Sequence, residues 1–336
     1  MPDGYAAAVP ANDPTTPAVE TWTVEIDVSG VGPEGSTTVA AELFLPSGRT
    51  EDEPLTLVVC FPGGGMTRRY FDLPEALPGR WSMARVLAEE FGVAVLAVDH
   101  LGVGDSPPPD DAYTLNPRVV SGVNAHVVAE MVRRLGEGSV AEAESAVEVG
   151  VVVGAGHSMG GLMVVHQQAR HGSFDAVALL GFGGAGLPEH LGPDELRYEG
   201  DYEGLEAALP SLVEARFGRP LVPSTTTSSD ALNPGAANGG RDLLAHAAGD
   251  LIAVSGLTSM VPGAADEVLA AIDVPVLVAA GENDIVHGFD ELPERMPAAP
   301  SVASYLVVGS GHNHVIATER EALFAEVGRW ITTLPT

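Results

Sequence analysis

Six short runs of uninterrupted apolar residues set the strongest limit on how this 336-residue chain folds. Between them lie stretches in which apolar residues recur with a helical period. Strands that are buried on both faces are typical of parallel sheets, so the pattern predicts an α/β fold with a mostly parallel, doubly wound sheet flanked by helices. The expected strands are 55–61, 93–99, 149–155, 174–182, 274–280 and 304–309. The expected helices are 81–91, 117–136, 159–171, 264–272 and 317–332.

The N-terminal part of the chain has a different pattern. Residues 21–28 and 37–46 alternate apolar and polar side chains, which predicts half-buried antiparallel strands. Residues 1–18 are rich in Ala, Pro and Thr and lack the basic and apolar regions of a secretory signal, so we expect a flexible tail. With no apolar run of membrane-spanning length, we expect a cytoplasmic protein.

The alternation of strands and helices is interrupted once, over about 80 residues. Residues 201–216 and 240–256 read as helices around a polar stretch, 222–240, and no buried strand is evident. A stretch of this kind is uncommon in a compact domain unless it is functional or mobile. We therefore expect 184–262 to be an inserted helical cap, on a core formed by residues 19–183 and 263–336.

Residues 156–160, GHSMG, match the G-x-S-x-G pattern of a serine nucleophile at a turn between a strand and a helix. The serine in such a turn has a strained backbone, and glycine neighbours allow the strand and the helix to approach closely. At the start of the helix, the backbone N–H of Met159 points to where an oxyanion would form. The pattern predicts Ser158 as a nucleophile.

A nucleophilic serine needs a base and an acid that orients the base. In this kind of fold they follow the serine in the order acid, then histidine, on loops after later strands. Asp284 follows one predicted strand and His312 follows the next. Glu282 and Asp290 are competing acids near the same loop.

The second histidine of GSGHNH, His314, competes with His312 for the role of the base. We expect only one of the two to face Ser158, and His312 follows the glycine-rich turn directly. His314 is expected to pack on the following helix or to line the pocket. The residues predicted to contact the substrate are Met66, His157 and His314.

The segment 61–71, FPGGGMTRRYF, supplies the second half of an oxyanion hole. Three successive glycines let backbone N–H groups approach a substrate oxygen without interference from side chains. Gly64 and Gly65 are the preferred donors, and Met66 is an alternative. Arg68 and its neighbour could contact a carboxylate on a substrate. No Walker motif follows these glycines, which argues against a phosphate-binding loop.

Composition excludes several classes of function. A formal charge of −30 repels phosphate backbones and anionic lipid surfaces, so we expect neither a nucleic-acid nor a membrane partner. The single cysteine, Cys60, lies in an apolar run and rules out an intrachain disulfide. No cluster with metal-ligand spacing is evident, and we expect no metal or cofactor. A homo-oligomer is left open.

On GHSMGG (156–161), GENDIV (281–286) and GSGHNH (309–314), the chain resembles α/β-hydrolase-fold enzymes of the capped serine-hydrolase type. DHLGVGDS (99–106) is similar to the loop after strand four in many members, and the likeness extends over roughly 20–334. The resemblance implies cleavage of a carboxylic ester, lactone, thioester or related bond through an acyl-enzyme, without a cofactor. One departure is Pro62, where many members carry a histidine.

A serine nucleophile argues against the aspartate-dependent relatives, the haloalkane dehalogenases and epoxide hydrolases. The expected cap carries four arginines and eleven acidic residues, a formal charge of −7, which disfavours polyanionic substrates. We therefore expect hydrolysis of a carboxylic ester or lactone of a neutral, largely apolar small molecule. The alternatives are a carbon–carbon bond hydrolase or a perhydrolase with the same triad, or a receptor-like binder with little turnover.

Overall fold

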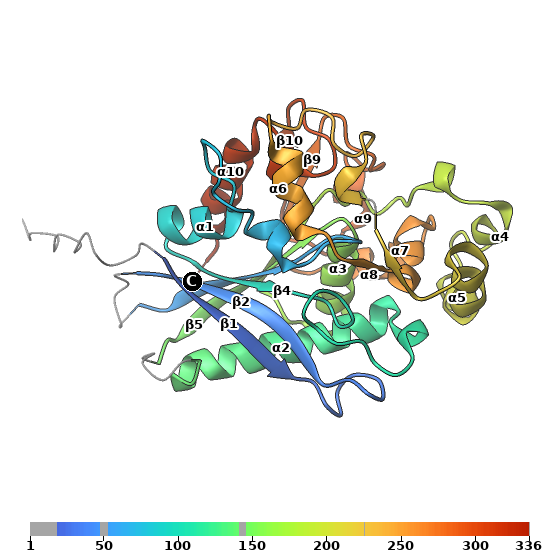
Figure 1. Cartoon of the computed structure of the whole chain (residues 1–336), viewed down its shortest axis with the longest axis horizontal. Helices are drawn as coiled ribbons and strands as arrows, with labels where there is room; N and C mark the ends of the chain where they lie inside the picture. Colours follow the sequence, from blue (N-terminus) through green and yellow to red (C-terminus); the bar gives the residue numbers. More distant parts are fainter. Residues whose placement is uncertain (1–18, 48–52, 141–145, 225, 336) are drawn as a thin grey trace, which may run out of the picture.

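The computed structural model describes residues 19–47, 53–140, 146–224 and 226–335. The predicted tail, 1–18, lies outside these ranges. Eight strands form one sheet in the order β1-β2-β4-β3-β5-β6-β9-β10 (Figure 1). They are β1 (Val19–Asp27), β2 (Thr38–Pro46), β3 (Leu55–Phe61), β4 (Ala94–Val98), β5 (Val149–His157), β6 (Ala176–Leu180), β9 (Val276–Gly281) and β10 (Val302–Val307).

The sheet is mostly parallel, as the apolar runs predict. Strand β2 pairs antiparallel with both β1 and β4, and all other pairs in the sheet are parallel. The strands β4, β6 and β9 are buried at every position, which explains why they read as continuous apolar runs. The α/β-hydrolase fold class expected from the sequence is confirmed.

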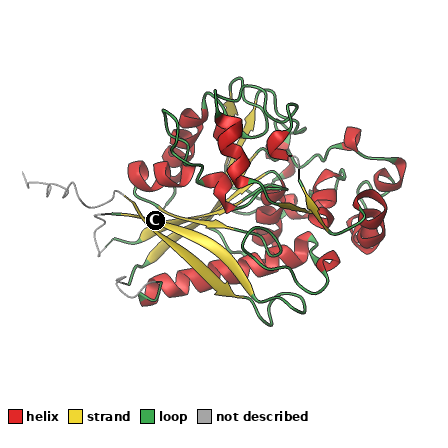
Figure 2. Ribbon diagram, viewed as in Figure 1, coloured by secondary structure: helices red, strands yellow, loops and turns green. Residues whose placement is uncertain are grey.

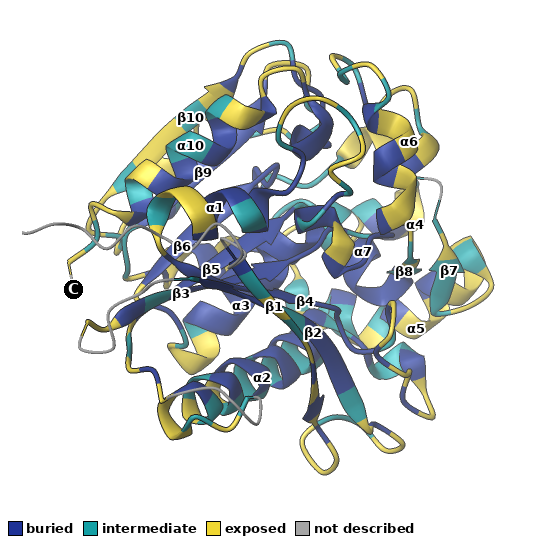
Figure 3. Cartoon of the chain, turned by 60° about the vertical axis from the view of Figure 1, so that its left-hand side comes forward, coloured by how far each residue is buried: buried dark blue, intermediate teal, exposed yellow. Residues whose placement is uncertain are grey.

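Helices cover both faces of the sheet, and the sheet lies between two buried apolar clusters (Figures 1 and 3). One cluster joins the sheet to α2, α3 and α8, and the other joins it to α1 and α10. These helices are α1 (Met83–Phe91), α2 (Pro117–Glu137), α3 (Met159–His171), α8 (Asp266–Ala270) and α10 (Arg320–Ile331). A short helix, α9 (Leu292–Arg295), precedes β10. Within the described ranges, no helix combines the length and the apolar character needed to cross a membrane.

Short elements fill the segment predicted as a cap (Figure 2). They are α4 (Pro193–Leu196), α5 (Tyr202–Phe217), β7 (Leu221–Pro223), α6 (Gly240–Leu244), β8 (Asp250–Ile252) and α7 (Ala253–Met260). Helices α5 and α7 share a small apolar cluster of their own, whereas Leu243 and Leu244 of α6 belong to the cluster around α1 and α10. The segment therefore packs as two parts, one beyond the strand ends and one on the core.

The single helix predicted for 240–256 is wrong, because the chain is broken into α6, β8 and α7. At the break, backbone groups of this segment form hydrogen bonds with the glycine-rich loop after β3 instead of the hydrogen bonds of a helix. Ala247 O accepts the N–H of Thr67 at 2.8 Å, and the N–H of Gly249 donates to Gly65 O at 3.0 Å. These tertiary bonds outweigh the local helical preference.

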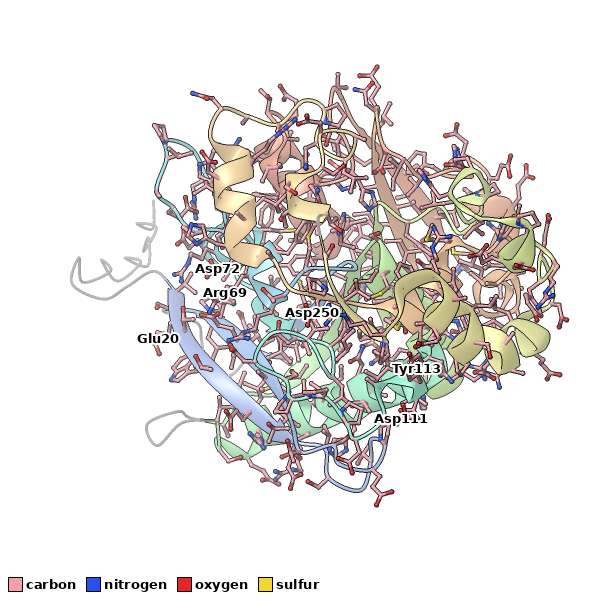
Figure 4. All side chains as sticks on the ribbon, turned by 45° about the vertical axis from the view of Figure 1, so that its right-hand side comes forward. Glu20, Arg69, Asp72, Asp111, Tyr113 and Asp250 are labelled. Atoms are coloured by element: carbon pink, nitrogen blue, oxygen red, sulfur yellow. The ribbon has the colours of Figure 1, made fainter. Side chains whose placement is uncertain are left out.

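The part that contains α5 contacts the core through the loop that leads into α2. Figure 4 shows Tyr113 on this loop beside α5, and its hydroxyl bonds to the carboxylate of Glu214. Arg118 and Glu206 form an ion pair at 3.3 Å. In α7, the hydroxyl of Ser255 donates to a core carbonyl oxygen at 2.8 Å.

Candidate active site

Ser158 stands at the tip of the turn between β5 and α3. Its φ of 53° is the one positive value of a non-glycine residue in the described parts of the chain. A residue with a side chain is strained in this conformation, and such strain persists only where the surroundings enforce it. A Cβ atom on Gly160 would lie 2.2 Å from the carbonyl oxygen of Phe61, so only glycine allows α3 to approach β3 this closely.

The predicted base and acid meet Ser158 at the carboxyl ends of the parallel strands. His312 lies in the loop after β10, with Nε2 2.8 Å from Ser158 Oγ. Its Nδ1 is 2.7 Å from Oδ1 of Asp284, which lies in the loop after β9. Because a carboxylate can only accept, Nδ1 carries a proton and Nε2 is left to accept the serine proton. The three residues are therefore arranged for nucleophilic catalysis.

The side chains of the acid and the base are buried, and Ser158 is partly exposed. Burial alone would raise the pKa of Asp284, but the imidazoles of His312 and His314, through charge and hydrogen bonds, hold this pKa well below its ordinary value. The backbone N–H groups of Gly281 and Val286 also donate to its carboxylate, each at 3.3 Å. Asp284 is therefore an ionised acceptor.

A recess of about 40 Å³ opens beside the Ser158 hydroxyl. Its walls come from the turn into α3, the glycine-rich loop after β6, the end of α7 and the two loops that carry Asp284 and His312. Apart from Ser158 and His312, the lining residues are Met159, Gly181, Phe182, Gly183, Gly184, Gly186, Leu187, Ser259, Ile285, Val286 and His287. A substrate group that reaches the serine through this recess meets mainly apolar side chains and backbone.

The glycine-rich loop after β3 borders the serine on another side. A Cβ on Gly63 would lie 3.1 Å from Ser158 Cβ, and one on Gly64 would lie 3.9 Å from Met159 Cβ. The N–H of Met66 donates to Gly63 O at 3.2 Å, so that N–H is engaged within the loop. Of the N–H groups considered from the sequence, those of Met159, Gly64 and Gly65 remain the candidates for an oxyanion hole.

A comparison of the whole sequence with protein families agrees with this geometry. The chain matches the family described as "Alpha/beta hydrolase family" over residues 58–327, which includes the elbow, the acid loop and the histidine loop. The chain belongs to the alpha/beta hydrolase family. No curated protein sequence matches this hydrolase significantly.

Solved structures share the fold of this hydrolase at low sequence identity. An esterase of M. tuberculosis is 17% identical with a TM-score of 0.53, and the alignment covers 95% of this chain and 93% of that chain. A bromoperoxidase from Bacillus anthracis is 16% identical with a TM-score of 0.54, covering 93% and 99%. Carboxyl esterase 2 from the fungus Tuber melanosporum is 17% identical with a TM-score of 0.54, covering 96% and 89%.

The three residues predicted to contact the substrate are buried and lie outside the described lining of the recess. Met66, His157 and His314 are each about 1% exposed, and none belongs to the described lining of the recess. His157 Nε2 donates to the carbonyl oxygen of His312 at 2.9 Å. His314 Nε2 lies 2.8 Å from Oδ2 of Asp284. Both histidines thus contact the catalytic pair from the interior.

The glycine-rich loop of the hydrolase is also fixed from the interior. His100 Nε2 donates to Pro62 O at 3.1 Å, and Asn124 donates to His100 Nδ1 at 3.3 Å. Burial lowers the pKa of His100 to about 4, so its ring is neutral at pH 7. His100, from the loop after β4, therefore binds the backbone of Pro62. Pro62 is the residue at which the family resemblance implies a histidine.

Arg68 does not line the substrate recess. The predicted contact between Arg68 and a substrate carboxylate is therefore wrong. Arg68 is 6% exposed, and its guanidinium bonds to the carboxylates of Asp99 and Asp105. Its backbone N–H also donates to Asp99 Oδ1, at 2.6 Å. The ion pair ties the far end of the glycine-rich loop to the end of β4.

Sequence reasoning missed the residues that hold the histidine loop, which we call the His-loop strap (residues 232–234). Leu232 O accepts the N–H of His312 at 2.9 Å, and Pro234 O accepts the N–H of Gly311 at 2.8 Å. Asn313 Nδ2 donates to Asn233 Oδ1 at 2.7 Å. The strap lies in the polar stretch of the predicted cap, where no periodic pattern signals a contact with residues 80 positions later.

Proposed function

We propose that this protein is a serine hydrolase that cleaves a carboxylic ester or lactone through an acyl-enzyme. The observation that carries the proposal is the pair of contacts at His312, 2.8 Å to Ser158 Oγ and 2.7 Å to Asp284 Oδ1. A partly exposed serine at a strained elbow, hydrogen-bonded to a buried histidine–carboxylate pair and beside an open recess, is what nucleophilic attack on a carbonyl carbon requires.

In the first half of the reaction, His312 Nε2 takes the proton of Ser158 as Oγ attacks the carbonyl carbon. The oxyanion is stabilised by the N–H of Met159 and by the Gly63–Gly65 loop. The carbon–oxygen bond to the leaving group then breaks, and His312 returns the proton to the alcohol oxygen. In the second half, water gives a proton to His312 as its oxygen attacks the acyl carbon. The bond from this carbon to Ser158 Oγ then breaks, His312 returns the proton to Oγ, and the acid leaves, while Asp284 orients the imidazole throughout.

The recess limits the size of the group that it accepts. Its volume of about 40 Å³ is far below the roughly 150 Å³ of an apolar cavity that holds benzene. We propose that the group beside Ser158 has the size of an acetyl or propionyl chain, and that any larger apolar part of a neutral substrate lies outside the recess. No arginine lines the recess within the described ranges, which agrees with a neutral substrate.

A fluorophosphonate probe and a series of p-nitrophenyl esters test both parts of the proposal. We expect one label per chain on Ser158, and a kcat/KM that falls from the acetate through the butyrate to the octanoate. Ser158→Ala should lose the label and roughly 10⁴-fold or more of the rate. Leu187→Ala, which removes part of the wall of the recess, should favour the butyrate relative to wild type.

The possible failures of these experiments are distinct. Wild-type turnover by Ser158→Ala would refute the nucleophile. Labelling of Ser158 without turnover of any ester would favour a binding protein or another type of bond. Equal rates on the acetate and the octanoate would refute the size limit and leave the triad unaffected.

A further inference from the structure

Asp284 accepts hydrogen bonds from two imidazoles, one on each carboxylate oxygen. His312 Nδ1 lies 2.7 Å from Oδ1, and His314 Nε2 lies 2.8 Å from Oδ2. The three side chains are 4%, 2% and 1% exposed for His312, Asp284 and His314. The triad accounts for only the first of these bonds. The second is as short and more deeply buried.

The surroundings of His314 determine which of its nitrogens carries the proton. Nε2 must donate, because its partner is a carboxylate. Nδ1 is buried and has no hydrogen-bond partner within the described parts of the chain. A bare Nδ1 leaves one weak acceptor unpaired, whereas a proton there would leave an unpaired buried donor as well as a charge. The side chain is thus set to act as a donor to Asp284.

The titratable groups that face this pair come from two other parts of the fold. His157, at the end of β5, lies 4.8 Å from the ring of His312 and 5.7 Å from that of His314, centroid to centroid. Tyr70, from the short 3-10 helix η1 (Arg68–Phe71), stacks on His157 at 4.4 Å. Burial, followed by the charge of Asp284, holds the pKa of Tyr70 well above its ordinary value, so it is a neutral phenol. Within the described ranges no group of three or more potential ligands is arranged to hold a metal ion.

We propose that His314 is a positioning residue that fixes the catalytic carboxylate of Asp284 through its second oxygen. This inference rests on the proposed function, since it assigns a role within the same triad. With His314 and Gly281 on Oδ2, and His312 and Val286 on Oδ1, the carboxylate cannot rotate without breaking hydrogen bonds on both sides. The imidazole of His312 is thereby kept aligned with Ser158.

The bond from His314 also affects the charge that His312 experiences. A donor on Oδ2 draws negative charge away from Oδ1. Without it, the carboxylate would stabilise the protonated form of His312 more strongly. Catalysis requires the unprotonated form of His312. As the solution is acidified, a variant without this bond would therefore lose activity at a higher pH than the wild type. A residue that only fills space would leave this pH dependence unchanged.

Two substitutions separate the hydrogen bond from the packing. His314→Phe keeps a ring but removes the donor, and His314→Gln keeps an N–H that can reach the carboxylate. With p-nitrophenyl acetate we expect His314→Phe to lower kcat by roughly 10- to 100-fold with little change in KM, the range expected for a lost hydrogen bond to a charged group. Its acid limb should move to higher pH, and His314→Gln should restore most of kcat.

The matched control is His166→Phe. His166 is also 1% exposed, but neither of its ring nitrogens has a hydrogen-bond partner among the described residues. This variant should keep the wild-type kcat and pH profile. Equal kcat losses in His314→Phe and His314→Gln, with the acid limb unmoved, would overturn the proposal. So would a His314→Phe enzyme that is indistinguishable from wild type.

A spectroscopic measurement tests the pair without any substrate. In protein labelled with ¹⁵N at histidine, we expect the ring N–H protons of His312 and His314, which donate to a carboxylate, at lower field than those of His100 and His157, which donate to carbonyl oxygens. His314→Phe should remove the His314 proton and shift that of His312. If Ser158→Ala kept full activity, the proposed function would fail, yet this spectrum would still report whether the two imidazoles share Asp284. A single proton at this lower field in the wild type would overturn the inference itself.

Discussion

At the scale of single residues, the catalytic positions can be predicted from the order of strands and motifs along the sequence. Ser158, Asp284 and His312 each follow a strand of the parallel sheet in the order expected for this fold, and the structure brings them together. The bond between His314 and Asp284 could not be predicted in the same way. It depends on the chain turning at once into the 3-10 helix η6 (His314–Ile316), and a short loop carries no periodic signal for that turn.

The backbone strain at Ser158 predicts a difference between two inactive variants. Both Ser158→Ala and Ser158→Gly lose the hydroxyl, but only glycine adopts a φ of 53° without strain. We expect the glycine variant to be more stable than the alanine variant by about 1 kcal/mol, measured as the free energy of unfolding in urea. An alanine variant that is equally stable or more stable would show that the turn is not strained.

At the scale of elements, strands and helices with clear periodicity were predicted well, and segments held by tertiary bonds were not. The breakup of 240–256 is decided by bonds from Thr67 and Gly249 that join this segment to the glycine-rich loop. The His-loop strap likewise has no signal of its own. In both cases the partner is distant in sequence, and a local pattern contains no information about it.

The ion pair between Arg68 and Asp99 predicts how firmly the glycine-rich loop is held. Arg68→Met leaves the carboxylate of Asp99 buried without its partner, and breaking a buried pair in this way costs about 3–5 kcal/mol. The neighbouring Arg69 is exposed (Figure 4), so Arg69→Met is a matched control with an expected change under about 0.5 kcal/mol. Urea unfolding of both variants measures the difference. Similar losses in the two would contradict a specific role for the pair.

At the scale of the whole molecule, the fold class and the burial of the central strands follow from composition and periodicity. The burial predicted for 304–309 is wrong, because β10 lies at the edge of the sheet and Leu306 is 48% exposed. Stability also depends on groups whose burial the sequence does not reveal. Three histidines outside the triad illustrate this. Burial lowers the pKa of His100 to about 4 and that of His166 to about 3, and it holds the pKa of His157 well below its ordinary value.

Buried histidines make folding sensitive to mild acid. The unfolded chain binds a proton at each histidine near pH 6.5 and the folded chain does not, so stability falls as the pH drops below that value. Between pH 7.5 and 5.5, each such histidine should contribute a loss of about 1.4 kcal/mol. We compare the free energy of unfolding of His166→Phe with that of the wild type. The difference, variant minus wild type, should increase by about 1.4 kcal/mol as the pH falls from 7.5 to 5.5.

The comparison of two proteins at two pH values removes the other large contribution. Protonation of carboxylates relieves repulsion in a chain with a formal charge of −30, and it does so equally in both proteins. A stability difference that does not change between the two pH values would mean that His166 binds protons equally in the folded and the unfolded state.

The His-loop strap has a consequence for the order in which the molecule is assembled. Asn233 and Asn313 are 80 positions apart, so their contact closes a long loop. Closing the loop costs chain entropy before the contact itself contributes any stability. We expect the strap to dock late, together with other pairings of distant segments such as that of β6 with β9. The base reaches its place only when the strap and the last loop have met. We therefore expect the local helices and strand pairs to form before His312 reaches Ser158.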